Sequence, residues 1–219
     1  MKSSLYLVPV LVITVFILIR ARFNNNQQQI YFFKPLSTLI VICAALLSFL
    51  EPTQNLLYTF GILLGLLFSI GGDIALMFDG KKSFITGLSL FFTAHIIYTI
   101  VFMLLGRFSL WDTLPAIILL TTGISFYVLI RSRLEATKLP VIGYIAIISI
   151  MVSRAFSTSS SPSFNNEQAL MIIAGALLFY ISDMILAANK FWKPWKYNHL
   201  SLIFYYSGQF FIALAASYF

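Results

Sequence analysis

Long apolar runs alternate with short polar clusters along the whole chain. The runs cover residues 4–20, 35–50, 56–78, 83–105, 113–130, 139–157, 168–188 and 199–219. Most of them come close to the length of about 20 residues that a helix needs to cross a bilayer, and none alternates as the strands of a membrane barrel do. The pattern predicts an all-α membrane protein, a bundle of eight transmembrane helices in a single domain over residues 1–219.

The composition supports this interpretation. Hydrophobic residues make up 60% of the chain and charged residues 10%, with a mean hydropathy of +0.93, whereas about a quarter of the residues in soluble proteins are charged. The longest connections, residues 24–29 and 157–167, are too short for a soluble domain. The first run lacks a small-residue cleavage site and its positive charge comes mainly after it, so we interpret it as a span and not as a signal peptide.

The basic residues indicate the orientation. Eleven of the 14 lysines and arginines follow odd-numbered runs: Arg20, Arg22, Lys34, Lys81, Lys82, Arg131, Arg133, Lys138, Lys190, Lys193 and Lys196. Only Lys2, Arg107 and Arg154 lie on the other side. The positive-inside rule then places these loops in the cytoplasm and both termini on the non-cytoplasmic side, and we expect a bacterial inner (cell) membrane. Because the charges are scattered among loops, nucleic acid is not an expected partner.

The two halves of the chain share landmarks. Asp73 in Gly72-Asp73-Ile74 and Asp183 in Ser182-Asp183-Met184 stand in the third and seventh runs, and prolines open corresponding runs at nearly the same offset. Residues 1–110 and 111–219 are therefore candidate parallel repeats of four helices each. Proline is common at helix starts, so chance remains the alternative.

Two acidic residues lie inside the apolar runs. They are Asp73 and Asp183, and each precedes the lysines of its loop by seven or eight residues, which corresponds to about 10 Å along a helix. An unpaired charge in the membrane costs roughly 2.5 to 3.5 kcal/mol, so such residues are candidates for function. We expect both carboxyl groups to face one cavity on the cytoplasmic side. The alternative is that each only bonds a neighbouring helix.

Other polar residues fall at similar depths. The third run carries a stripe of small residues that ends at Ser69 and Asp73, which favours close helix packing. The fourth run places His95 on an aromatic face, and the last run carries Tyr205 and Gln209. We expect a polar layer of Asp73, His95, Asp183, Tyr205 and Gln209. Lys34, at the mouth of the second run, is a candidate phosphate ligand, although topology alone also explains it.

Several chemistries are disfavoured. With only His95 and His199 available, a three-histidine zinc site cannot form, and we expect neither a metal nor a cofactor. Cys43 has no base that we can assign to it, and no nucleophile elbow or phosphate-binding glycine loop is present. Ile70-Gly71-Gly72-Asp73 lacks the first glycine of the Gly-x-Gly-Asp motif of intramembrane aspartyl proteases. An acid pair remains.

At these residues the chain resembles the YhhN family of membrane proteins, which includes lysoplasmalogenases. The resemblance rests on ordered fragments from the second to the eighth run: Phe33-Lys34-Pro35-Leu36, Ser69 to Leu76, Gly87 through His95 to Tyr98, Gly175-Ala176 with Phe179, Ser182-Asp183, and Tyr205 to Gln209. It implies an eight-helix fold and cleavage of the vinyl ether of lysoplasmalogens to a fatty aldehyde and a glycerophospho-base. It also implies Asp73 and Asp183 as the catalytic pair. We expect the following residues to bind substrate or support the acids: Lys34, Ser69, His95, Tyr98, Ser182, Tyr205 and Gln209.

The chemistry of a vinyl ether suits such a pair. Proton transfer to the β-carbon gives an oxocarbenium ion that water attacks, which calls for one protonated and one ionised carboxyl group. The expected partners are a lysophospholipid substrate and the surrounding membrane lipids. Two alternatives remain: hydrolysis of another lysolipid on the same fold, and a proton-coupled transporter, which would also place acids in a polar layer.

Overall fold

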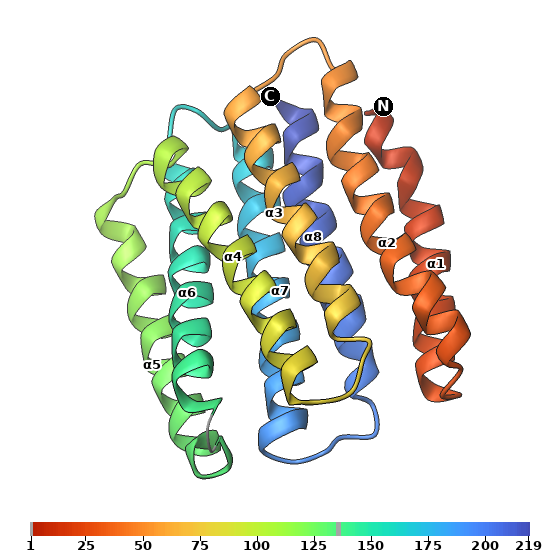
Figure 1. The fold of residues 1–219 in the computed structure, drawn as a ribbon. Coiled ribbons are helices and arrows are strands. Elements are labelled where there is room, and N and C mark those ends of the chain that lie inside the picture. The colour runs from red at the N-terminus through yellow and green to blue at the C-terminus, as the bar shows by residue number, and fades with distance from the viewer. Residues whose placement is uncertain (1, 135–136) are drawn as a thin grey trace.

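The computed structural model describes residues 2–134 and 137–219, and these form a bundle of long helices (Figure 1). Eight helical segments are long and apolar enough to cross a membrane, as the hydropathy pattern predicts. The main helices are α1 Val8–Phe23, α2 Gln27–Leu47, α3 Leu56–Ala75, α4 Lys81–Leu105, α5 Thr113–Ile130, α6 Lys138–Phe156, α7 Asn166–Phe191 and α8 Ser201–Ala215. Short 3₁₀ turns extend several of them, including η7 Asn198–Leu200 before α8.

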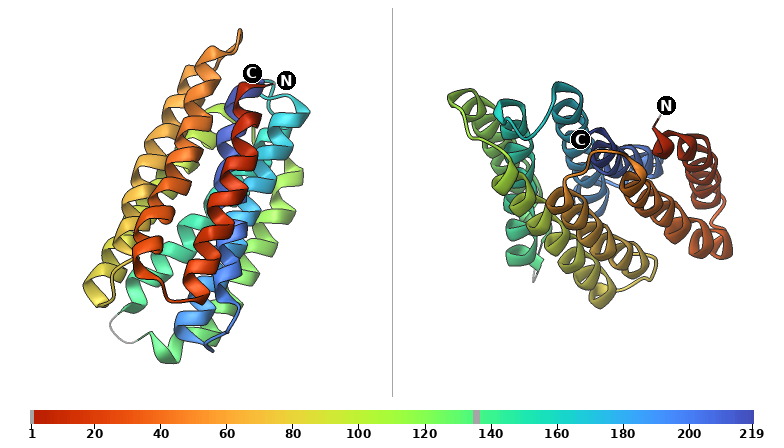
Figure 2. Two further views of the ribbon diagram at one scale, coloured as in Figure 1. Left: turned by 90° about the vertical axis from the view of Figure 1, so that its right-hand side faces the viewer. Right: turned by 90° about the horizontal axis from the view of Figure 1, so that it is seen from above.

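The two ends of the bundle differ in charge. Both termini lie at one end (Figure 1), and α1, α3, α5 and α7 finish at the other. We call the latter the basic end, because most lysines and arginines lie there. Seen along the bundle, α8 runs through the interior and α5 lies at the periphery (Figure 2). Accordingly α8 has the most buried span of the eight and α5 the least.

The outer surface is apolar over the length of the helices. On α5 alone the exposed large side chains include Leu114, Ile117, Ile118, Leu120 and Ile124. A water-soluble monomer rarely exposes a contiguous apolar surface of this extent. A lipid environment removes that cost, because the hydrocarbon solvates these side chains.

The second helix begins earlier than hydropathy predicts. It starts at Gln27 and not at residue 35, and the Oδ1 of Asn26 caps it by accepting a hydrogen bond from the Gln29 amide at 3.2 Å. Hydropathy marks where the chain becomes apolar, whereas glutamines form helix readily outside the apolar region. The prediction that residues 24–29 form a loop is therefore wrong for residues 27–29, half of the stretch. Pro35 lies inside α2, and Lys34 lies two turns into it.

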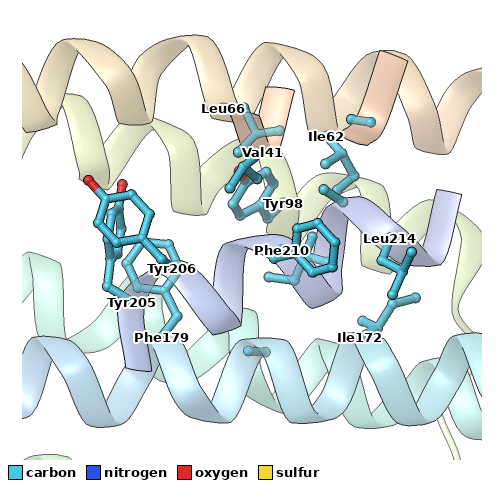
Figure 3. Close-up of a cluster of buried hydrophobic side chains, with 14 of the residues drawn as sticks. Val41, Ile62, Leu66, Tyr98, Ile172, Phe179, Tyr205, Tyr206, Phe210 and Leu214 are labelled. Atoms are coloured by element: carbon cyan, nitrogen blue, oxygen red, sulfur yellow. The ribbon is translucent and has the colours of Figure 1, made fainter. Parts of the chain in front are cut away.

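The small-residue stripe of α3 packs against the aromatic face of α4. A Cβ at Gly72 would meet the Phe91 ring at 2.7 Å, and a Cβ at Gly65 would overlap the ring of Tyr98. Large side chains of α4 thus fill the space that the glycines leave open. Figure 3 shows Tyr98 in the core beside Leu66 of α3 and above Phe210 of α8.

A second close crossing joins α7 to α8. A Cβ at Gly175 would lie 2.7 Å from the carbonyl oxygen of Gly208, and a Cβ at Gly208 would lie 2.7 Å from that of Gly175. The two backbones therefore touch, which only glycine permits at both positions. This crossing fixes α8 against the helix that carries Asp183.

Candidate functional site

Asp73 on α3 is a buried carboxylate surrounded by donors. It is 2% exposed, and its Oδ2 accepts hydrogen bonds from the hydroxyls of Thr38 at 2.6 Å and Tyr205 at 2.8 Å. The Nζ of Lys34 lies 3.3 Å from its Oδ1 and donates to its backbone carbonyl at 2.9 Å. The Asp73 side chain is therefore held by two other helices, α2 and α8, which fixes its position.

The helix α2 places Lys34 and Thr38 on one face, because four residues separate them. The backbone carbonyl of Lys34 accepts a hydrogen bond from Tyr206 of α8 at 2.9 Å, and the Lys34 side chain is almost fully buried. Figure 3 shows the neighbouring hydroxyls of Tyr205 and Tyr206 on the same side of α8. Lys34 thus compensates the charge of Asp73, and its ammonium is engaged within the protein. This geometry favours a supporting role over the phosphate contact that the sequence suggests.

Asp183 on α7 has different neighbours. Its Oδ2 accepts a hydrogen bond from Tyr144 of α6 at 2.5 Å, and the Nε2 of His95 lies 3.5 Å away. Its side chain is 14% exposed, more than that of Asp73, and neither lysine nor arginine forms an ion pair with it among the described residues. The two carboxyl groups therefore differ in what balances their charge.

His95 supports Asp183 through Tyr144. The Tyr144 hydroxyl donates to Asp183, so at its 3.0 Å contact with His95 it accepts from the Nε2–H. The Nδ1 of His95 is buried without a hydrogen-bond partner among the described residues.

Both carboxyl groups face one cavity of about 200 Å³. Ser182 and Tyr205 also line it, as does Lys34. The remaining lining residues come mainly from the basic-end parts of the helices and from η7: Arg22, Leu76, Phe91, Leu186, Asn189, Asn198, His199, Ser201 and Leu202. The shared cavity that the sequence predicts for the two acids is therefore present.

An apolar pocket adjoins this cavity. It has a volume of about 60 Å³ and shares four lining residues with the cavity, namely Leu76, Phe91, Asp183 and Leu186. Its other walls come from α4, α5, α6 and α7 and include the aromatic rings of Phe84 and Phe126. Asp183 therefore stands where a cavity lined by several charged and polar side chains meets a pocket lined almost wholly by apolar ones.

The model of the YhhN family matches residues 29–216, which includes both aspartates and all their hydrogen-bond partners. The chain belongs to the YhhN family. Like its relatives that are described as membrane proteins, it is an integral multi-pass membrane protein.

Two kinds of YhhN-family relatives are similar to the chain. The membrane protein YhhN of Escherichia coli O157:H7, described as uncharacterized, is 27% identical over 197 residues, covering 88% of this chain and 89% of the relative. Human lysoplasmalogenase TMEM86B is 31% identical over 194 residues, covering 87% and 78%. Bovine lysoplasmalogenase TMEM86A is 31% identical over 157 residues, covering 71% and 64%. No solved structure matches the chain significantly.

Three further residues from the sequence analysis lie behind the cavity of this YhhN-family protein. Tyr98 donates to the Oε1 of Gln209 at 3.0 Å, Gln209 donates to Ser69 at 3.0 Å, and Ser69 donates to the carbonyl of Gly65 at 3.0 Å. All three side chains are buried, and none of them lines the cavity. The expected single polar layer is therefore divided. This chain of hydrogen bonds links α3, α4 and α8 about one helical turn from Asp73, on the side away from the basic end.

Four residues of the candidate site are not predicted from the sequence. Thr38 had a usable signal, because it follows Lys34 by one helical turn. Tyr144 had none among 11 tyrosines, and Arg22 and Asn198 look like ordinary residues of a basic loop. Among residues 2–134 and 137–219, no three His, Cys, Asp or Glu side chains gather closely enough to hold a metal ion. Activity without a metal stays a prediction that a chelator would test.

Proposed function

We propose that this protein is a hydrolase of the lysoplasmalogenase type, which cleaves the vinyl ether of a lysophospholipid to a fatty aldehyde and a glycerophospho-base. The observation that carries the proposal is the pair of carboxyl groups on one cavity, with Lys34 beside Asp73 and neither a lysine nor an arginine paired with Asp183 among the described residues. The names of the relatives TMEM86A and TMEM86B support the choice of substrate.

In this proposal Asp73 is the ionised member of the pair. Hydrogen bonds from Thr38 and Tyr205 and the ammonium of Lys34 all stabilise a negative charge on its oxygens. The negative charge of Asp73 stabilises the oxocarbenium ion as it forms, and this ion is electrophilic enough to react with water.

Asp183 is the member that carries the proton. Its Oδ2 accepts from Tyr144, while its Oδ1 has no partner among the described residues and is free to hold a hydrogen. Among the described residues neither a lysine nor an arginine pairs with an ionised form, whereas Lys34 pairs with Asp73. The general acid of the reaction is therefore Asp183.

The steps balance between the two residues. Asp183 transfers its proton to the β-carbon of the vinyl ether, which leaves an oxocarbenium ion at the carbon bound to oxygen. Water attacks this carbon and gives up a proton to Asp73, forming a hemiacetal. The hemiacetal then collapses: its hydroxyl proton returns to Asp183, the carbon–oxygen bond breaks, and the glyceryl oxygen takes the proton from Asp73. Aldehyde and alcohol leave, and both acids regain their starting states.

The two adjoining spaces suit a lipid with one chain. The polar cavity would hold the glycerol and its headgroup, and the first carbons of the chain would enter the apolar pocket past Asp183. The vinyl ether joins these two parts of the molecule, so it would lie beside the residue that stands between the two spaces. We further propose that the basic end faces the cytoplasm, as the distribution of lysine and arginine indicates.

The test is fatty-aldehyde release by the purified, detergent-solubilised protein from a synthetic lysoplasmalogen. Asp73→Asn and Asp183→Asn should each lower the rate by about a hundredfold or more, since each removes one member of an acid–base pair. Glu167→Gln is the matched control, because Glu167 is exposed in the first turn of α7 at the end opposite the cavity; its rate should equal that of the wild type.

An ester lysolipid of the same chain length distinguishes the substrate class. The proposal predicts aldehyde from the vinyl ether and no fatty acid from the ester. Cleavage of the ester alone would assign the site to another lysolipid. Near-normal aldehyde release by either aspartate variant would contradict the acid-pair mechanism.

A further inference from the structure

Arg22 reaches the cavity without a partner for its charge. It lies in the last turn of α1, is half-buried, and lines the same cavity as Asp73 and Asp183. Within the described part of the chain its guanidinium forms neither an ion pair nor a hydrogen bond, although Lys34 beside it pairs with Asp73. A half-buried guanidinium that faces a cavity and has no protein partner is suited to bind an anion from outside the protein, because its planar N–H groups match the oxygens of a carboxylate or phosphate.

Two side-chain amides that line the same cavity also have polar atoms without a hydrogen-bond partner among the described residues. Asn198 of η7 lines the cavity, and its Oδ1 is buried without a hydrogen-bond partner. Asn189 of α7 uses its Oδ1 to accept from the Trp195 amide at 2.8 Å, which leaves its NH₂ group without a protein acceptor among the described residues. Buried polar atoms are rarely left unpaired, so the Oδ1 of Asn198 marks a place where a ligand completes the bonding, and the NH₂ of Asn189 is a further free donor beside it.

The position of this group relative to the acids suggests which ligand. Asn198 precedes Tyr205 by seven residues, and Tyr205 bonds Asp73, so the group lies about 10 Å nearer the basic end along the axis of α8. A glycerol unit together with the reach of an arginine side chain covers a comparable distance. A lipid whose vinyl ether lies at the acids would therefore bring its phosphate to Arg22.

We propose that Arg22, Asn189 and Asn198 form a binding site for the phosphodiester of the lysophospholipid headgroup. Arg22 donates to the phosphate oxygens, the NH₂ of Asn189 adds a further donor, and the Oδ1 of Asn198 accepts a hydrogen bond from a donor on the alcohol esterified to the phosphate. This inference rests on the proposed function for the kind of lipid that enters the cavity. It assigns to Arg22 the phosphate contact for which Lys34, paired with Asp73, is not free.

The test is a binding measurement that needs no turnover. The probe is an unreactive analogue in which a saturated ether replaces the vinyl ether of the lysolipid, titrated against the detergent-solubilised protein. Arg22→Gln should weaken its binding by about tenfold to a hundredfold, the usual worth of a hydrogen bond to a charged group. Arg22→Lys keeps the positive charge but not the planar guanidinium, so its affinity for the analogue should fall less than that of Arg22→Gln.

Two controls separate headgroup recognition from other effects. Arg20→Gln makes the same change of charge on the same helix, but Arg20 is exposed and does not line the cavity; it should bind as the wild type does. The 1-alkylglycerol of the same chain length, which lacks the phosphate, should bind wild type and Arg22→Gln equally.

Three results would overturn the proposal. The affinity of Arg22→Gln for the phosphate-bearing analogue could equal that of the wild type, Arg20→Gln could lose as much affinity for it as Arg22→Gln does, or Arg22→Gln could lose as much affinity for the alkylglycerol as for the analogue. A competition with inorganic phosphate distinguishes the source of the anion. If phosphate alone binds at Arg22 as tightly as the lipid analogue does, the site is not one for lipid headgroups. Because the analogue is not cleaved, a failure of the hydrolase assay leaves this measurement intact.

Discussion

The chemistry of the site depends on the different surroundings of two aspartate side chains. Asp73 has Lys34, Thr38 and Tyr205 around it, and Asp183 has Tyr144 and His95. Removing one partner of a buried ion pair such as Lys34–Asp73 costs about 3 to 5 kcal/mol, because the other charge stays behind in the low-dielectric interior. Lys34 therefore has a structural role as well as an electrostatic one.

The hydroxyl of Tyr144 orients Asp183, and removing it should slow the chemical step. We expect Tyr144→Phe to lower kcat by about tenfold with little change in KM, since the variant loses a hydrogen bond to the acid and no contact with the lipid headgroup. Tyr180→Phe is the matched control: Tyr180 lines the same apolar pocket, and within the described part of the chain its hydroxyl has no hydrogen-bond partner. Steady-state kinetics of aldehyde release measure both. Equal losses in the two variants, or an effect on KM alone, would contradict this role.

Sequence reasoning at the residue scale identifies charges better than neutral partners. Asp73 and Asp183 stand out because a charge is rare inside an apolar run, and His95 stands out for the same reason. Tyr144 lies on an apolar helix, where a tyrosine is a common core residue, so only the fold reveals its contact with Asp183. Hydropathy alone places Lys34 at the start of its helix, whereas α2 begins seven residues earlier, at Gln27.

At the scale of elements, the position of α8 decides the geometry of the site. This helix brings Tyr205 to Asp73, while its glycine contact with α7 sets its distance from the helix of Asp183. A change at that contact therefore acts on both acids without touching either.

Gly208→Ala should destabilise the protein and lower its activity together. The added Cβ would lie 2.7 Å from the Gly175 carbonyl oxygen and 2.9 Å from the Phe179 amide nitrogen; backbone atoms cannot move aside as a flexible side chain can, so we expect a loss of about 1 to 3 kcal/mol.

Gly143→Ala is the control for the glycine contact. Its Cβ would meet only the Phe92 ring at 3.6 Å, an ordinary contact, and alanine is the better helix former. Thermal unfolding in detergent should show a lower Tm for Gly208→Ala and an equal or higher Tm for Gly143→Ala. The reverse order would contradict the close crossing of α7 and α8.

Element boundaries and contacts follow from the sequence to different degrees. The spacing of Gly61 and Gly65 predicts close packing on α3, and α4 does pack there. The partner of Gly208 could not be predicted, because a glycine pattern indicates a close approach but not which helix approaches. Pro35 was expected to open a helix and instead lies within one.

At the scale of the whole molecule, the eight spans follow directly from hydropathy, since only helices satisfy the backbone within lipid in so apolar a chain. The order in which the helices pack does not follow, because lipid-facing and core-facing apolar residues look alike in sequence. The division of the chain into repeated halves stays a prediction.

The orientation of the whole bundle is tested by reporters at the C-terminus. With the basic end in the cytoplasm, a C-terminal alkaline phosphatase fusion should be active in a bacterial host and a C-terminal green fluorescent protein fusion dark. The same reporters placed after α7 should give the opposite signals. A fluorescent C-terminal fusion would reverse the proposed orientation and place the cavity toward the other side of the membrane.

The central claim is that the cavity protonates a vinyl ether, and the most direct test is turnover of a synthetic lysoplasmalogen in D₂O, with the aldehyde reduced as it forms and analysed by mass spectrometry and NMR. The account predicts one deuterium at carbon 2 of the product, in a single configuration, because Asp183 delivers the proton to one face of the β-carbon. Aldehyde without deuterium at that carbon, or cleavage that yields no aldehyde, would contradict it.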